Sequence, residues 1–260
     1  MDFTFDDVQL ELKSQARAWL EQRYPLDRDW DNQDDRRQEL GELGWLDVAE
    51  AGLGFVEEAL LLEEMGYVLY PGPYLAHVAG QTEANGFAFG GDCDIATVDP
   101  TRPLRRVATA SPETPRLRAA MAAEAVGVAQ RALELGVEYA KGREQFGKKI
   151  GVYQAVSHKL ADTYADVELA RSLAYWAAWC VAEDDEQAPI AAAAAKAFAV
   201  EAAVAACERS IQVLGGIGFT WEHPLHRLYK RALWLEGFGS RPAELRAEVA
   251  DALLGAPVAV

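Results

Sequence analysis

The sequence predicts an all-α protein with a small N-terminal helical domain (residues 1–70), a short middle segment (71–115) and a C-terminal four-helix bundle (116–260). Three observations lead to this prediction. Apolar residues recur at helical spacing in the first 70 residues, prolines and glycines gather in the middle segment, and strong helix formers dominate from Arg116 onward.

The N-terminal domain is expected to contain two clear helices with a shorter one between them. Residues 3–22 carry apolar side chains every three or four positions: Phe5, Val8, Leu12, Ala16, Trp19 and Leu20. The acidic stretch 31–38 leads into "ELGELGWLDV", a short helix that Gly41 and Gly44 interrupt. The stretch "GFVEEALLLEEMGYVLY" predicts another helix, with an apolar face and an acidic face.

The middle segment has a different composition. It holds prolines at 71, 73, 100, 103, 112 and 115, and glycines at 72, 80, 86, 90 and 91. Because strands average about 5–6 residues and need turns between them, this length supplies a few strands at most. The stretches "GFAFG" and "DIATV" are the candidates, and the segment is otherwise expected to be irregular.

The C-terminal part predicts three long helices and a final shorter pair. The first starts at Arg116 and ends near Gly142, and the others cover residues 154–182, 189–213, 224–236 and 241–254. The loops "FGKKIGVYQ", "EDDEQAP" and "LGGIGFTWEHP" separate them. Up-and-down helices joined by short loops are typical of a four-helix bundle.

Charge and composition exclude some classes of function. The net charge of −16 argues against a nucleic-acid partner, because phosphates would be repelled. No apolar run approaches the roughly 20 residues of a membrane span, and the acidic N-terminus does not resemble a signal peptide. We therefore expect a cytoplasmic protein without a membrane partner.

Cysteines and histidines give no indication of a metal site. The cysteines are few and far apart, so we expect buried reduced thiols at Cys93, Cys180 and Cys207. The histidines form no H-E-x-x-H pattern and are expected to be packing or solvent residues, although His223 and His226 leave a remote metal alternative.

Three stretches contain motifs that a four-helix bundle does not in general require. They are "GREQFGKKIGVYQAVSHKLAD", "IQVLGGIGFTWEHPLHRLYKRA" and the N-terminal "ELGELGWLDV" with "LGFVEEALLLEEMGYVLYPGPYL". Together they resemble the acyl-CoA dehydrogenase family over about residues 1–75 and 116–245. The resemblance implies three domains (α-helical, β-barrel, α-helical), bound FAD, and removal of an α-proton from an acyl-CoA while a hydride leaves the β-carbon for the flavin.

The resemblance also implies a set of cofactor contacts. In the family, the C-terminal bundle of one subunit contacts the diphosphate and adenine half of the FAD held by its neighbour. The matching residues here are Arg143, Gln145, Phe146, Gln212, Gly215 and Gly216.

The chemistry of these residues agrees with that role. An arginine fork suits a diphosphate, the amides of the glutamines can donate and accept, and glycines, Gly218 included, let the backbone approach a cofactor. Each residue also has a simpler reading, in which Arg143 caps a helix and Gly215 and Gly216 end one. The "GGIG" run is not a Rossmann loop, because a helix rather than a strand precedes it.

The chain departs from the family in its middle segment, where the β-domain is largely missing. A homodimer would have adenine-side contacts without a wall for the flavin ring. We therefore expect a longer acyl-CoA dehydrogenase partner in an α2β2 complex. The stretch "GFTWEHPLHRLYKRA" looks most similar to heteromeric actinobacterial enzymes that act on steroid side-chain CoA thioesters. An electron-acceptor flavoprotein is a further partner that this resemblance allows.

The catalytic base also departs from the family pattern. Proton abstraction next to a thioester needs a carboxylate in a dry site. Counted without gaps from "GIGF", one family position falls on Gly239, and the other falls near Leu117, between Glu113 and Glu124. We expect no catalytic residue in this chain, with Glu236 as a weak candidate that would need a three-residue gap. Ser240 is expected to cap the last helix ahead of Pro242.

Two alternatives to a non-catalytic subunit remain open. The chain could be a self-sufficient dehydrogenase that uses Glu236 as its base. It could instead be a redox-silent helical scaffold or binding module that has lost its cofactor, although the joint presence of Arg143, Gln145, Phe146 and Gln212 argues against this.

Overall fold

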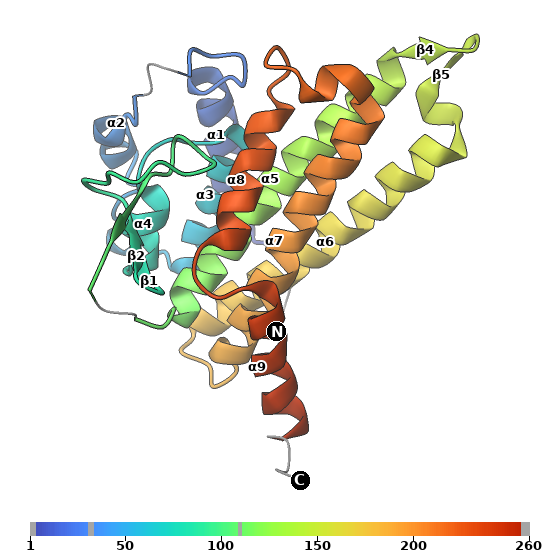
Figure 1. Ribbon diagram of the computed structural model, residues 1–260. Coiled ribbons are helices and arrows are strands. Elements are labelled where there is room, and N and C mark those ends of the chain that lie inside the picture. Colours follow the sequence, from blue (N-terminus) through green and yellow to red (C-terminus); the bar gives the residue numbers. More distant parts are fainter. Residues whose placement is uncertain (1–3, 31–33, 109–110, 256–260) are drawn as a thin grey trace.

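The computed structural model describes residues 4–30, 34–108 and 111–255, and helices make up most of them (Figure 1). Phe3 and residues 31–33, at the start of two predicted features, lie outside the described residues. The α-helices are α1 (Asp7–Arg23), α2 (Arg37–Glu42), α3 (Phe55–Val68), α4 (Tyr74–Ala79), α5 (Pro115–Gly142), α6 (Gln154–Ala182), α7 (Ala188–Leu214), α8 (Leu225–Gly237) and α9 (Pro242–Leu254). The short 3-10 helices are η1 (Val48–Ala51), η2 (Ile150–Val152) and η3 (Gly215–Phe219). The prediction of an all-α fold is confirmed.

Helices α5, α6, α7 and α8 form the four-helix bundle, and α3 packs against α5 on the side of the N-terminal helices (Figure 1). The α3–α5 contact depends on glycine. A Cβ atom on Gly127 would overlap the carbonyl oxygen of Glu63, and one on Gly66 would overlap the carbonyl oxygen of Glu124. Helix α9 extends beyond the bundle and contacts α7 through Leu245.

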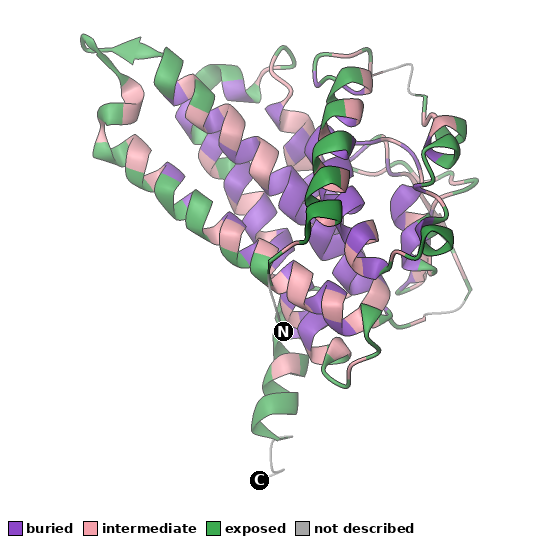
Figure 2. Cartoon of the chain, turned by 180° about the vertical axis from the view of Figure 1, so that it is seen from behind, coloured by how far each residue is buried: buried purple, intermediate pink, exposed green. Residues whose placement is uncertain are grey.

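The core runs without interruption from α1 through α8, and the buried residues fill the helices at the centre of the molecule (Figure 2). Helix α7, with η3, is long and apolar enough to cross a membrane by composition, but 67% of its most apolar window is buried inside the molecule. Its many alanines allow neighbouring helices to approach closely. We interpret it as the central core helix of the bundle.

The first helix begins later than its apolar spacing suggested. Asp6 is the N-cap residue of α1, and its carboxylate accepts a hydrogen bond from the Gln9 backbone at 2.8 Å. The Gln9 side chain in turn accepts from the Asp6 backbone, which completes a capping box. This cap sets the helix start at Asp7.

The glutamates of α3 do not form a solvent-facing surface. Glu63 and Glu64 are buried, and they pair with Lys13 and Arg17 of α1 and Arg171 of α6. The acidic face is therefore an ionic contact that joins α1, α3 and the bundle.

The described part of the middle segment contains three short antiparallel strands in the order β1 (Glu83–Ala84), β2 (Phe87–Phe89) and β3 (Leu104–Arg106). The stretch "GFAFG" supplies β2. The stretch "DIATV" forms no strand and contributes only an isolated bridge from Ile95 to Leu104. Helix α4 was not predicted there.

The cysteines are all free thiols. Cys180 and Cys207 are buried, as expected, whereas Cys93 is only partly buried. Burial raises the pKa of the Cys207 thiol, which keeps it in the neutral form. The expectation for Cys93 was wrong because it lies in the loop after β2, away from the core.

Candidate functional site

Three of the predicted cofactor residues lie at the far end of α5, on a small hairpin (Figure 1). Arg143 is the C-cap residue of α5, and the strands β4 (Glu144–Gln145) and β5 (Lys148–Lys149) follow it. Phe146 and Gly147 form the two-residue turn, both with positive φ, as a type I′ hairpin turn requires. Arg143 and Gln145 are exposed, and the Phe146 side chain is 92% exposed at the tip.

The other predicted cofactor residues lie where α7 ends. Gln212 is exposed on the last turn of α7, and Gly215 follows as the C-cap with a φ of 68°. A Cβ atom on Gly215 or Gly216 would meet no atom within 4 Å, so their outer side is open. Gly218 is different, because it packs against the backbone of Ile211.

The C-terminal end of α5 and the loop that follows η3 lie on either side of a small cavity. A cavity of about 470 Å³ is lined by Arg143, Tyr139 and Glu138 from the end of α5 and by His223 from the loop that follows η3. The structure therefore brings Arg143 beside the segment that continues from the Gln212 turn. Gln212, Gly215 and Gly216 do not line this cavity themselves.

A larger cavity lies at the opposite end of α8. It has a volume of about 670 Å³ and separates the β1–β3 sheet from the C-terminal end of α8. Trp234 and Phe238 stack on each other with ring centroids 5.0 Å apart, and they form an aromatic wall. Phe87 and Leu104 line the sheet side.

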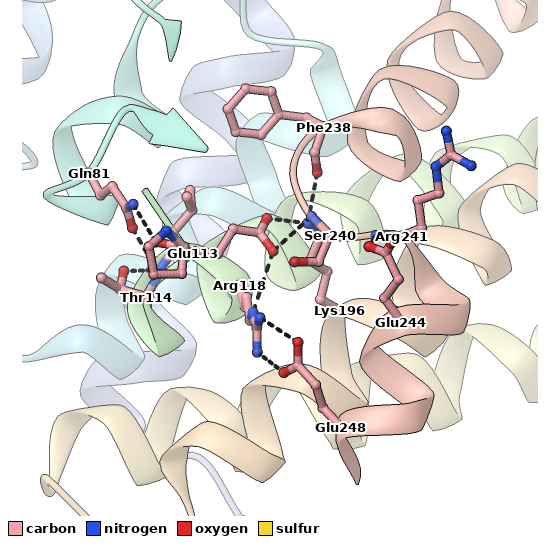
Figure 3. Close-up of polar contacts among 12 residues, drawn as sticks. Gln81, Glu113, Thr114, Arg118, Lys196, Phe238, Ser240, Arg241, Glu244 and Glu248 are labelled. Atoms are coloured by element: carbon pink, nitrogen blue, oxygen red, sulfur yellow. Dashed lines mark hydrogen bonds and ion pairs between the residues drawn. The ribbon is translucent and has the colours of Figure 1, made fainter. Parts of the chain in front are cut away.

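Behind this wall lies a fully buried ion pair between Glu113 and Lys196 (Figure 3). Lys196 also donates to the carbonyl oxygen of Phe238 at 2.8 Å, and Glu113 accepts from the backbone N–H of Ser240 at 3.1 Å. Arg118 lies 3.4 Å from Glu113 and forms two hydrogen bonds to Glu248. Burial lowers the pKa of Lys196, although the charge of Glu113 opposes this effect.

The ion pair restricts position 239. Gly239 has a φ of 74°, and a Cβ atom on it would overlap the carboxylate of Glu113. Only glycine fits at this position while Glu113 is in place. The sequence placed Glu113 ahead of α5 but gave no sign of its partner, because Lys196 is 83 residues away along the chain.

The carboxylates near the larger cavity differ in their access to it. Glu236 does not line it. Glu236 lies half-buried on α8, and burial followed by the charges of Glu201 and Glu208 raises its pKa. Glu244 does line the cavity, but it is exposed and accepts a hydrogen bond from the Arg241 backbone at 2.9 Å.

Two further sequence expectations concern the N-cap of α9 and the second position expected for the catalytic base, near Leu117. Arg241, not Ser240, is the N-cap residue of α9. The Ser240 prediction was wrong because α9 begins at Pro242, so Ser240 lies one residue before the N-cap position. Leu117 is fully buried, and Glu124 is bound by Arg102 and Arg231 in the core.

Comparison with known proteins identifies the family. Residues 109–251 match the family described as "Acyl-CoA dehydrogenase, C-terminal domain", which is more than half of the chain. The chain belongs to the acyl-CoA dehydrogenase family.

The relatives within the family are longer proteins. The chain is 41% identical over 146 residues to "Acyl-CoA dehydrogenase IpdE2" of Mycobacterium tuberculosis, an alignment that covers 53% of this chain and 44% of the relative. It is 43% identical over 164 residues to "Acyl-CoA dehydrogenase FadE34" of the same organism, covering 56% of this chain and 23% of the relative. The matched region thus spans less than half the length of these curated relatives.

Solved structures show the same fold. A chain of the ChsE4-ChsE5 complex from Mycobacterium tuberculosis superposes with a TM-score of 0.80 at 22% identity, covering 99% of this chain and 100% of the other. Butyryl-CoA dehydrogenase from Megasphaera elsdenii superposes with a TM-score of 0.79 at 20% identity, covering 98% and 100%. These superpositions show that the chain has the same overall fold as these proteins.

The retained surface fits one part of the family cofactor, FAD. The exposed guanidinium of Arg143, the exposed amides of Gln145 and Gln212 and the open backbone at Gly215 would hold a diphosphate and its adenine end. The sheet of two- and three-residue strands leaves little backbone to enclose the flavin ring. The chemistry of these exposed groups suits the diphosphate end of FAD, and their joint role in holding it is a proposal.

Proposed function

We propose that this chain is a non-catalytic subunit of a heteromeric, FAD-dependent acyl-CoA dehydrogenase. The complex would carry out α,β-dehydrogenation of a CoA thioester. A longer family member would hold the FAD ring and supply the base, and this chain would supply contacts to the diphosphate and adenine end.

One observation carries the proposal. The reaction needs a free carboxylate to take the α-proton of the thioester. The position that the family resemblance assigns to that carboxylate is Gly239, and the space for a side chain there is filled by Glu113. Glu113 is itself paired with Lys196 and accepts a hydrogen bond from the Ser240 N–H, and it is not among the residues that line the cavity.

The solved structures of similar fold support the partner and the substrate that we propose. Two of the structurally similar proteins are described as the ChsE4-ChsE5 complex and the Tcur3481-Tcur3483 steroid ACAD, each with two differently named components. By analogy, an α2β2 complex and a steroid side-chain CoA are the assembly and substrate that we propose. The substrate's hydride would reduce the flavin held by the longer subunit. A separate electron-acceptor flavoprotein would then reoxidise that flavin.

Co-expression with a longer acyl-CoA dehydrogenase encoded beside it tests the assembly. We expect a yellow complex with a flavin absorption spectrum, while the chain purified alone is colourless. Stoichiometric FAD on the isolated chain would contradict the proposal.

The cofactor edge is tested by an Arg143→Ala substitution in that complex. Loss of the bidentate contact should release FAD during gel filtration, with at least a tenfold weaker affinity, because charge-assisted hydrogen bonds are among the stronger ones. Lys141→Ala, which removes a neighbouring exposed charge, serves as the control. A complex that kept its full flavin content without Arg143 would favour the redox-silent scaffold.

One observation favours the self-sufficient alternative. The pKa of Glu236 is raised by burial, and a general base in a dry site needs such a shift. If this alternative held, Glu236→Gln would abolish dehydrogenation. The proposed division of labour expects unchanged turnover.

A further inference from the structure

Three buried polar atoms at the junction of the middle segment and the bundle have no hydrogen-bond partner among the described residues. They are the Nε of Arg102, the Oε2 of Glu124 and the indole Nε1 of Trp234. The three residues come from the middle segment, α5 and α8, and each is at most 5% exposed. Because a buried donor or acceptor is costly to leave unpaired, three of them in one region of the core require an explanation.

The contacts of Arg102 place these three atoms close together. Its Nη2 donates to the Oε1 of Glu124 at 2.7 Å. Nε is bonded to the same carbon as Nη2, and Oε2 to the same carbon as Oε1, so both unpaired atoms lie beside this hydrogen bond. The guanidinium carbon of Arg102 also lies 5.8 Å from the centre of the Trp234 ring. The indole N–H is therefore close to the same arginine.

The unpaired atoms cannot all satisfy one another directly. The Nε of Arg102 and the Nε1 of Trp234 are both donors, so no hydrogen bond can form between these two atoms. Two donors and one carboxylate oxygen that are close but unbonded are the arrangement in which a small polar molecule bridges between groups.

The charges around these atoms favour a neutral molecule over an ion. Arg102 and Arg231 carry two positive charges, and Glu124 and Asp99 carry two negative charges that they pair with. An anion buried here would find no uncompensated cation, and a cation would find no uncompensated carboxylate. The cost of removing either ion from water would therefore not be recovered.

The hydrogen-bonding capacity of one water molecule matches the three atoms. Water accepts two hydrogen bonds and donates two, and buried waters make about three on average. The two N–H groups use both of its acceptor positions, and the Glu124 oxygen uses one of its protons. A molecule with fewer acceptor positions or no proton would leave at least one of the three atoms unpaired.

We propose that one buried water molecule binds at this junction, accepts hydrogen bonds from the Nε of Arg102 and the Nε1 of Trp234, and donates one to the Oε2 of Glu124. This bridging water connects the buried charges to Trp234, which forms part of the wall of the larger cavity. Stacking on Phe238 alone does not select between the two orientations that rotation about χ2 allows the indole ring, whereas a hydrogen bond from Nε1 does. The inference does not depend on the proposed function.

A crystal structure of the full chain, at a resolution that shows ordered waters, tests the bridging water directly. We expect one water oxygen at about 2.7–3.2 Å from all three atoms. The proposal is overturned if no water lies there, if the Nε of Arg102 instead donates directly to the Oε2 of Glu124, or if the density belongs to an ion.

The indole proton of Trp234 provides a second measurement, in solution. In the chain prepared with isotope-labelled tryptophan, this proton should show dipolar cross-relaxation with a long-lived water in nuclear magnetic resonance spectra. Trp234→Phe keeps an aromatic ring and removes the donor, so the signal that disappears in this variant is that of Trp234. The control is Trp30, whose indole N–H already donates to the carbonyl oxygen of Leu26 at 3.1 Å and should show no long-lived water.

Absence of cross-relaxation at the Trp234 proton would overturn the proposal, as would an equal signal at Trp30. The crystal structure uses the unsubstituted chain, so the bridging water remains testable if Trp234→Phe fails to fold.

Discussion

At the scale of single residues, the Glu113–Lys196 ion pair has the largest consequence. It is buried on all sides and fixes three features of the end of α8: the carbonyl of Phe238, the N–H of Ser240 and the absence of a side chain at Gly239. A buried pair of this kind is weak evidence for stability, because desolvation offsets attraction. Its effect here is to specify the conformation of residues 238–240.

Removing one partner of this pair should cost more than removing both. Lys196→Met leaves the Glu113 carboxylate buried with only Arg118 and Ser240, and we expect a loss of about 3 kcal/mol in the free energy of unfolding. The double variant Glu113→Gln/Lys196→Met should recover at least half of that loss. Urea denaturation of both variants measures the difference, and a double variant no more stable than Lys196→Met would contradict the coupling of the two residues.

His226 predicts a pH dependence of stability. Its pKa is lowered to about 4 by burial first and then by the charges of Arg227 and Lys230. Between about pH 6.5 and 4 the unfolded chain binds a proton that the folded chain excludes, so stability is full above pH 6.5 and falls as the pH decreases through this window.

Thermal unfolding between pH 7.5 and 4.5 tests the His226 prediction. A His226→Gln variant, which cannot titrate, should lose less stability over this range than the unsubstituted chain. Parallel curves for the two proteins would show that His226 does not contribute.

At the scale of elements, the closeness of α3 and α5 depends on their facing glycines. A Cβ on Gly127 would overlap the Glu63 carbonyl and lie 2.7 Å from the Tyr67 nitrogen, and both are backbone atoms that cannot move alone. We expect Gly127→Ala to destabilise the chain by about 2–3 kcal/mol despite the better helix propensity of alanine.

Gly142→Ala at the end of the same helix is the control. A Cβ there meets nothing within 4 Å, so the substitution should be neutral or slightly stabilising. Denaturant unfolding compares the two variants. A Gly127→Ala protein as stable as Gly142→Ala would mean that α3 and α5 separate at little cost.

Local sequence signals determine most of the helix boundaries. The long helices could be predicted nearly to the residue, as for α6 at 154–182, because propensity, apolar spacing and loop residues are local signals. The pairing of Glu113 with Lys196, and of Asp99 with Arg231 at a separation of 132 residues, has no local signal. The motifs around Arg143 and Gln212 lie at exposed positions in the structure, and the roles of these residues in binding FAD stay predictions.

At the scale of the whole molecule, a second buried ionic cluster joins the middle segment to the bundle. Arg231 of α8 binds Asp99, Thr101 and Glu124, and Glu124 of α5 also binds Arg102. The strands of the middle segment are too short to hold it in place through backbone pairing alone. We therefore infer that this cluster makes the middle segment unfold together with the helices.

Arg231→Met tests that inference, because it leaves Asp99 buried without its main cation. We expect a loss of about 3–5 kcal/mol in the free energy of unfolding, and hydrogen exchange in residues 95–106 that becomes faster than exchange in the bundle helices. Arg246→Met, which breaks only the exposed pair with Glu201, should cost less than about 1 kcal/mol. Equal exchange rates in the middle segment and the bundle helices of the Arg231→Met variant would contradict the inference. The apolar contacts of Phe89 with Trp234 and Phe238 would then be sufficient to hold the middle segment on the bundle.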